Sequence, residues 1–140
     1  MTVTLVGPEP SGLAAVVSEL IERNLARDPG RRRLLRPSVA VLQAEDADVE
    51  VFLRIGPDGV RVGDGLVPDA HVRIRSNAEF LLALTTVPLR FGLPDPLRPE
   101  GRAVIRELLT GRLRVGGLLT QPIRLARLTQ LLSVVEGAAG

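Results

Sequence analysis

The chain contains no cysteine, lysine, tyrosine or tryptophan, and its only histidine is His71. Without cysteine, neither a disulfide nor thiolate chemistry is available. Without lysine and tyrosine, Schiff-base and tyrosine mechanisms are excluded too. A metal site would have to be built from carboxylates and one imidazole. His71 remains as the one candidate imidazole base, but the chain has no Gly-x-Ser-x-Gly motif, no P-loop and no other catalytic signature. We expect a protein that is not an enzyme, with no catalytic residue, no cofactor and no metal.

The charge of the chain is also limited. Its 18 basic residues are all arginine and are nearly balanced by 16 acidic ones, for a net charge of +2. So small an excess, without interleaved aromatic side chains, predicts no nucleic-acid partner. No apolar run approaches the roughly 20 residues that span a bilayer. The first residues lack the pattern of a secretory signal, so we expect a cytoplasmic protein.

The 140 residues predict one domain, and the first helix is expected over about residues 11–28. Ser11 is a good N-cap, and Asp28-Pro-Gly30 ends the helix. Residues 2–6 fit either a strand end or a loosely held terminus. The basic run Arg31–Arg33 with Arg36 is best read as a solvated connector. A contact with phosphate or anionic lipid is the alternative.

From Val39 the apolar period changes to two, which is typical of half-buried strands. Residues 49–63 predict a hairpin around the turn Gly56-Pro-Asp-Gly59, and residues 69–75 predict the next strand. The four acidic residues within 45–50 lack the spacing of a calcium-binding loop, so we do not assign a metal to them.

The second half returns to helical spacing. Ser76 and Glu79 predict a capping box that opens a helix over 76–87. The apolar, proline-rich segment 89–97 is either a lid or a loop packed on the core. Pro99 can start a short helix over Gly101–Leu109, which precedes a strand over 111–117. Thr120 is expected to cap a last helix through 135, with Ile123 and Leu128 in its apolar stripe.

These elements predict an α+β domain, with a mainly antiparallel sheet and the helices packed on one of its faces. Period two puts the apolar residues of the strands on one face. It puts the following arginines on the other: Arg54, Arg61, Arg73, Arg75, Arg112 and Arg114. The pattern leaves open whether sheet and helices enclose a filled core or a cavity.

Two stretches resemble the sterol carrier protein lipid-binding family. The first is the strand from Asp69 into Ser76, followed by Glu79, Phe80 and Leu81. The second is Gly111-Arg-Leu-Arg-Val-Gly-Gly117 before an apolar terminal helix. The likeness covers roughly residues 35–135. It implies a five-stranded sheet and a hydrophobic tunnel between sheet and helices that binds sterols, fatty acyl chains or similar lipids without catalysis.

On this resemblance the tunnel-lining residues would be Phe80, Leu81, Leu84, Leu89, Phe91, Leu113, Val115, Leu118, Leu119, Ile123 and Leu128. The implied partner is a lipid or another hydrophobic small molecule. The arginines suggest an anionic membrane surface as a second partner.

Two alternatives stay open. The same fold with a collapsed cavity would be a protein-interaction module, with a homodimer as one form of it. An enzyme is the third reading, and it would require a polar cluster around His71 and Asp69.

Overall fold

The structure is a computed structural model that describes residues 2–7, 10–86, 89–90, 93–94, 97–116 and 120–133. Its elements in chain order are β1 (Thr2–Leu5), α1 (Gly12–Arg27), the 3-10 helix η1 (Pro29–Leu34), β2 (Ser38–Ala44), β3 (Val49–Gly56), β4 (Gly59–Asp64), β5 (Val72–Ser76), α2 (Ala78–Ala83), the 3-10 helix η2 (Leu84–Thr86), β6 (Leu89–Arg90), β7 (Leu93–Pro94), α3 (Pro99–Leu109), β8 (Arg114–Gly116) and α4 (Pro122–Leu132).

The main sheet has six strands in the order β1-β4-β3-β2-β5-β8, one more than predicted. The additional strand is β1, for which the sequence left a loose terminus as an alternative. Residue Val3 lies opposite Val60, so β1 pairs in parallel with a strand far along the chain. The β2–β5 pair is also parallel, and the other three pairs are antiparallel. The sheet is therefore mixed.

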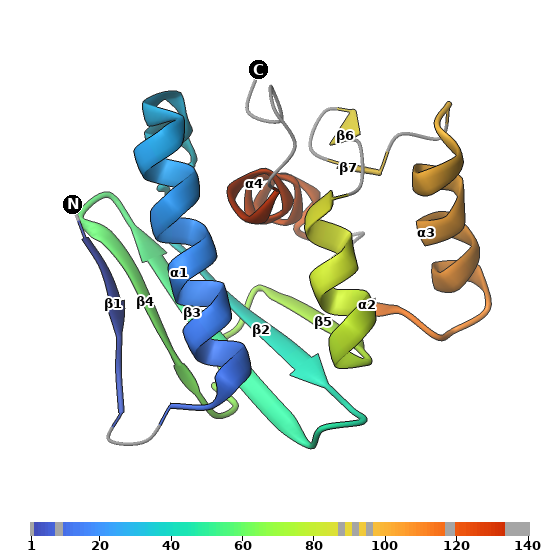
Figure 1. Cartoon of the computed structure of the whole chain (residues 1–140), viewed down its shortest axis with the longest axis horizontal. Coiled ribbons are helices and arrows are strands. Elements are labelled where there is room, and N and C mark those ends of the chain that lie inside the picture. Colours follow the sequence, from blue (N-terminus) through green and yellow to red (C-terminus); the bar gives the residue numbers. More distant parts are fainter. Residues whose placement is uncertain are drawn as a thin grey trace.

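Helices lie over one face of this sheet. Figure 1 shows α1 crossing in front of β3 and β4, and α2 crossing near β5, with α4 between the two helices. The α+β layer predicted from the sequence is confirmed. The inward residues of the strands join apolar side chains of the helices in one core that includes Val51, Leu53, Val60, Val62, Val72, Ile74 and Leu113.

Helix α1 begins where its cap was predicted. The amide of Ala14 donates to Ser11 Oγ at 3.1 Å, which satisfies one free N–H of the first turn. Asp64, at the end of β4, accepts from the Ser11 amide at 2.6 Å and so ties the cap to the sheet. Ala14, Val17 and Ile21 are buried on one side of the helix. Burial of a Val or Ile side chain contributes about 1.5–3 kcal/mol.

The opposite face of the sheet carries most of the predicted arginines. Arg54 lies opposite Arg61, and Arg75 lies opposite Arg114. Arg112 differs, because it precedes β8 and lies in the turn after α3. The loop between β4 and β5 folds onto this face, where Arg73 Nη2 donates to the Val67 carbonyl at 3.0 Å.

A glycine allows an aromatic ring to lie flat on this face. A Cβ added at Gly63 would come within 2.6 Å of Val6 Cγ2 and 2.7 Å of the Phe52 ring. The ring therefore occupies the space that a side chain on β4 would fill. Arg54 lies over the same ring, with its guanidinium carbon 5.9 Å from the centroid.

Candidate functional site

Six of the residues predicted to line a tunnel come from α2, η2, β8 with the turn before it, and α4. Leu81, Leu113 and Leu128 are buried in the core, with at most 7% of their surface exposed. Phe80 and Leu84 are half-buried and pack against the edge of that core, as does Val115. The fold thus brings these six residues into one apolar region, three inside it and three at its margin.

Helix α2 is oriented by polar contacts that differ from those predicted. Its N-cap is Asn77, whose side chain accepts from the Phe80 amide at 2.7 Å, so the prediction of Ser76 as the cap is wrong. Asp46 accepts from the Ala78 amide at 2.8 Å. Ser76 is instead the buried end of β5, and its hydroxyl donates to the Arg112 carbonyl at 3.3 Å.

The turn after α3 sets the position of β8. The amides of Arg112 and Leu113 both donate to the Glu107 carbonyl at 3.1 Å. This turn directs Leu113 into the core, where it is 4% exposed. The strand then pairs with β5 through Ile74 and Val115, which are direct neighbours across the ladder.

A groove opens beside Phe80, between the start of α2, the end of α3 and β8. Its volume is about 550 Å³. Its walls are Glu45, Asp46, Ser76, Asn77, Phe80, Glu107, Gly111, Arg112 and Arg114. Phe80 supplies the aromatic surface of this groove, and most of the other walls are polar or charged.

Of the other predicted lining residues, the structure describes the side chain of Ile123 alone. Ile123 is 67% exposed, so the prediction that it belongs to the buried stripe of α4 is wrong. Helix α4 starts at Pro122 with Gln121 as N-cap, not Thr120. Leu89 lies in β6, but its side chain is outside the described residues. Phe91, Leu118 and Leu119 lie wholly outside the described residues.

His71 and Asp69, which lie just before β5, both make contacts within the sheet region. His71 Nδ1 accepts from the Val39 amide at 3.0 Å, and its own amide donates to the Val39 carbonyl at 2.8 Å. Asp69 Oδ2 accepts from Arg54 Nη1 at 2.9 Å. This hydrogen bond lowers the pKa of the Asp69 carboxyl.

The described part of the chain contains neither a metal-binding group of side chains nor a membrane-spanning helix. There, no group of three or more His, Cys, Asp or Glu side chains is arranged to hold a metal ion. Within the same residues, no helix has both the length and the apolar character needed to cross a bilayer.

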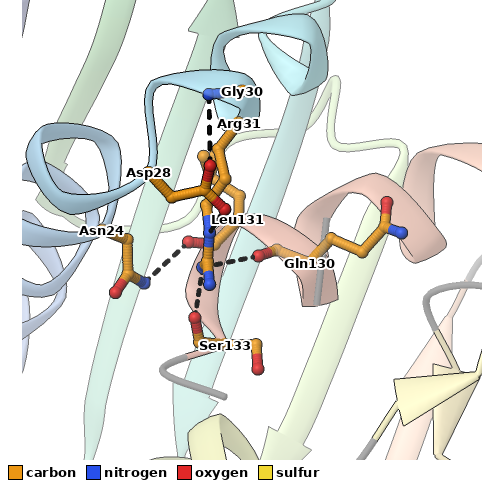
Figure 2. A network of polar contacts seen from close by, with 7 residues as sticks. All are labelled: Asn24, Asp28, Gly30, Arg31, Gln130, Leu131 and Ser133. Carbon is orange, nitrogen blue, oxygen red and sulfur yellow. Dashed lines mark hydrogen bonds and ion pairs between the residues drawn. The ribbon is translucent and has the colours of Figure 1, made fainter. Parts of the chain in front are cut away.

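A polar network at the end of α4 was not predicted from the sequence. Figure 2 shows Arg31 reaching from η1 to the last turn of α4, where Nη1 donates to the carbonyls of Gln130 (3.0 Å) and Ser133. Asn24 Nδ2 donates to the Leu131 carbonyl at 3.0 Å. Arg31 is 1% exposed, whereas the sequence indicated a solvated run. Cationic and amide donors satisfy carbonyls that a helix end leaves free.

Comparisons with known proteins agree with this architecture. No protein-family model matches the chain, and no curated protein matches it. A solved structure described as "UbiJ-SCP2 Ubiquinone synthesis protein" is similar, with a TM-score of 0.60 and 21% sequence identity over 86% of this chain and 91% of that chain. The chain therefore has a fold like that of sterol carrier protein domains, as the two sequence stretches predicted.

Proposed function

We propose that the protein binds a lipid through its apolar region between the sheet and helices α2 and α4, and that it does so without catalysis. The observation that carries the proposal is the sterol-carrier-like fold, matched over most of both chains. The ligand would be a sterol, a fatty acyl chain or a similar hydrophobic molecule. Transfer of that lipid between membranes would follow from reversible binding.

The margin of the core supports this proposal. Phe80 is half-buried and lines the groove of about 550 Å³, and Leu84 and Val115 are half-buried elsewhere at the margin of the same core. Each methylene of a ligand that leaves water contributes about 0.8 kcal/mol. A chain of several methylenes would therefore gain useful affinity with few polar contacts. A tunnel reaching inward from this groove is part of the proposal.

The absence of catalysis is likewise a proposal. Its support is that Asp69 is paired with Arg54, and that His71 Nδ1 already accepts a backbone amide. Neither group is aimed at a shared reaction centre in the described contacts. A His71→Ala variant that loses a chemical turnover of the bound lipid would contradict it.

A protein-interaction module is the second candidate. Leu81, Leu113 and Leu128 fill the space beneath α2 and α4, which is what a collapsed cavity would look like. Leu97 and Leu109 are 68% and 81% exposed, and they would supply apolar surface for a partner or a second copy. A dry protein that forms a stable dimer would favour this candidate.

The first experiment is native mass spectrometry of freshly purified protein, followed by organic extraction. A retained lipid mass supports the proposal and identifies the ligand class. The similar solved structure is that of a ubiquinone synthesis protein, so ubiquinone belongs among the added ligands with oleate and cholesterol. A bare mass, together with no displacement of a fluorescent fatty acid, would favour the interaction module.

An engineered tryptophan makes the binding position visible, because the chain has none. In Phe80→Trp, we expect oleate to shift the emission to shorter wavelength and to saturate, since the indole would leave water at the groove. Leu66→Trp, at a 55% exposed position in the loop between β4 and β5, is the matched control and should not respond. Equal responses of both variants would place the lipid elsewhere.

A further inference from the structure

A second groove lies between α4 and the segment that runs from the end of η1 to Pro37, and it shares no lining residue with the groove beside Phe80. Its volume is about 890 Å³. Its walls are Arg33, Leu34, Arg36, Pro37, Pro122, Ile123, Arg124, Ala126, Arg127 and Gln130. Four of these ten residues are arginines and none is acidic, so the groove is strongly positive in a chain whose net charge is only +2.

The four arginines are available to an external anion. Arg33 and Arg36 are exposed, and Arg124 and Arg127 are half-buried. Among the described residues, none of the four forms an ion pair with a carboxylate. Arg124 is oriented by Gln121 Oε1 at 2.5 Å and, more weakly, by the Pro37 carbonyl at 3.5 Å. Guanidinium groups bind phosphate oxygens in bidentate geometry.

The groove also presents apolar surface. Ile123 is 67% exposed, and Pro37 and Pro122 are exposed beside it. Exposure of a large aliphatic side chain next to several cations is unfavourable in water. It suits the boundary of a bilayer, where the apolar side chain enters the acyl region and the arginines stay at the phosphates.

The two walls of the groove are held in a defined relation. Arg31 and Asn24 bind the carbonyls at the end of α4, and Arg31 Nε also pairs with Asp28 at 3.3 Å (Figure 2). Leu34 and Leu125 are buried beneath the walls. The arginines of η1 and of α4 are therefore held by a packed scaffold, so binding orders little beyond their own side chains.

We propose that this groove is the surface by which the protein docks onto an anionic phospholipid bilayer, with Ile123 inserted and Arg33, Arg36, Arg124 and Arg127 on the lipid phosphates. The inference rests on the proposed lipid binding, because a lipid carrier must meet the membrane that supplies its cargo. Each arginine near an anionic surface contributes about 1 kcal/mol, or roughly fivefold in partition.

The test is co-sedimentation of the full chain with two kinds of vesicle. One is made of phosphatidylcholine alone, and the other also contains about 30 mol% phosphatidylglycerol, which makes its surface anionic. We expect strong partition into the anionic vesicles only, weakened by added salt. Arg33→Gln with Arg36→Gln should lower that partition by about twentyfold. The matched control, Arg61→Gln with Arg106→Gln, removes the same charge at exposed positions outside the groove and should change it less than about threefold.

A second pair of variants tests insertion. Ile123→Ser should lower partition into anionic vesicles by about fivefold, because a largely exposed aliphatic side chain no longer enters the bilayer. Leu109→Ser is the matched control on α3 and should have no effect. Equal losses in both arginine pairs, equal losses in both serine variants, or binding independent of anionic lipid would each overturn the assignment.

This result is separable from the lipid-binding proposal. Native mass spectrometry and fatty-acid displacement should be unchanged in the arginine and Ile123 variants, since none of these residues lines the groove beside Phe80. Lipid retention without vesicle docking would overturn the docking surface alone. Docking without any retained or displaced lipid would contradict the proposed function and leave the docking surface standing.

Discussion

Arg31 and Arg33 are two residues apart in one basic run, yet the fold uses them in opposite ways. Arg31 is 1% exposed and binds the end of α4, whereas Arg33 is exposed in the wall of the η1–α4 groove. Arg73, on the outer face of the sheet, is an intermediate case. It is half-buried and donates to the Val67 carbonyl of the loop that folds onto this face. An arginine side chain can therefore be structural, partly structural or available to an external partner, depending on which segments of the chain cover it.

The largest expected effect concerns the buried member of this comparison. Arg31→Ala leaves the carbonyls of Gln130 and Ser133 without their donor and removes a buried cation that pairs with Asp28. We expect the free energy of unfolding to fall by about 3–5 kcal/mol, measured by urea denaturation. Arg33→Ala is the control and should change it by less than about 0.5 kcal/mol. Similar values for the two variants would refute the contrast.

A smaller effect is expected on the outer face of the sheet. Arg73→Ala removes the hydrogen bond to the Val67 carbonyl, which ties the β4–β5 loop to the outer face of the sheet. We expect a loss of about 1 kcal/mol in the same measurement. Arg61→Ala, on the same face but exposed, serves as the comparison and should be near neutral. A loss as large as that of Arg31→Ala would mean that Arg73 contributes as much to the free energy of unfolding as Arg31 does.

The smallest effect is a pH dependence at the exposed Arg54–Asp69 pair. Arg54 lowers the pKa of the Asp69 carboxyl in the folded chain. A depressed carboxyl pKa contributes stability that is present above the unfolded pKa and is lost as pH falls through the folded pKa. In a carboxyl NMR titration, Arg54→Gln should raise the pKa of Asp69 toward its ordinary value. No upward shift would show that the pair does not persist in solution.

Much of the fold follows from local spacing. The alternation in residues 49–55 put Val51 and Leu53 on the buried face, and the structure confirms both. Ser11 was predicted to cap the first helix, and it does. Such predictions succeed because the face on which a side chain lies depends on its position within its own strand or helix.

The errors have a common origin in contacts between distant segments. The sequence placed the α2 cap at Ser76, but pairing of β5 with β2 carries that residue into the sheet and passes the cap to Asn77. The parallel partner of β1 lies beyond α1 and two further strands, so no local pattern indicates it. Ile123 fits the helical period of its neighbours, yet only the packing of α4 shows that it faces outward.

The candidate site, like the fold, was predicted from the sequence only in part. The short stretches around Ser76 and Gly111 predicted a sterol-carrier-like fold, and the apolar stripe of the second helix indicated Phe80 and Leu81. Which of these residues are fully enclosed and which stand at a margin depends on the turn at Glu107 and on β8. The groove beside Phe80 is made of three segments, 45–46, 76–80 and 107–114, that lie far apart in the sequence.

By itself, the sequence determined the class of fold, the buried face of β3, β4 and β5, the limits of α1 and the exclusion of thiol and amine chemistry. Those properties follow from periodicity and from residue types, which are local. Only the tertiary structure decided that Arg31 is buried, because its carbonyl partner on Gln130 is 99 residues away. It likewise decided that Arg33 and Arg127 share one groove, since burial and charge depend on the segments that folding brings together.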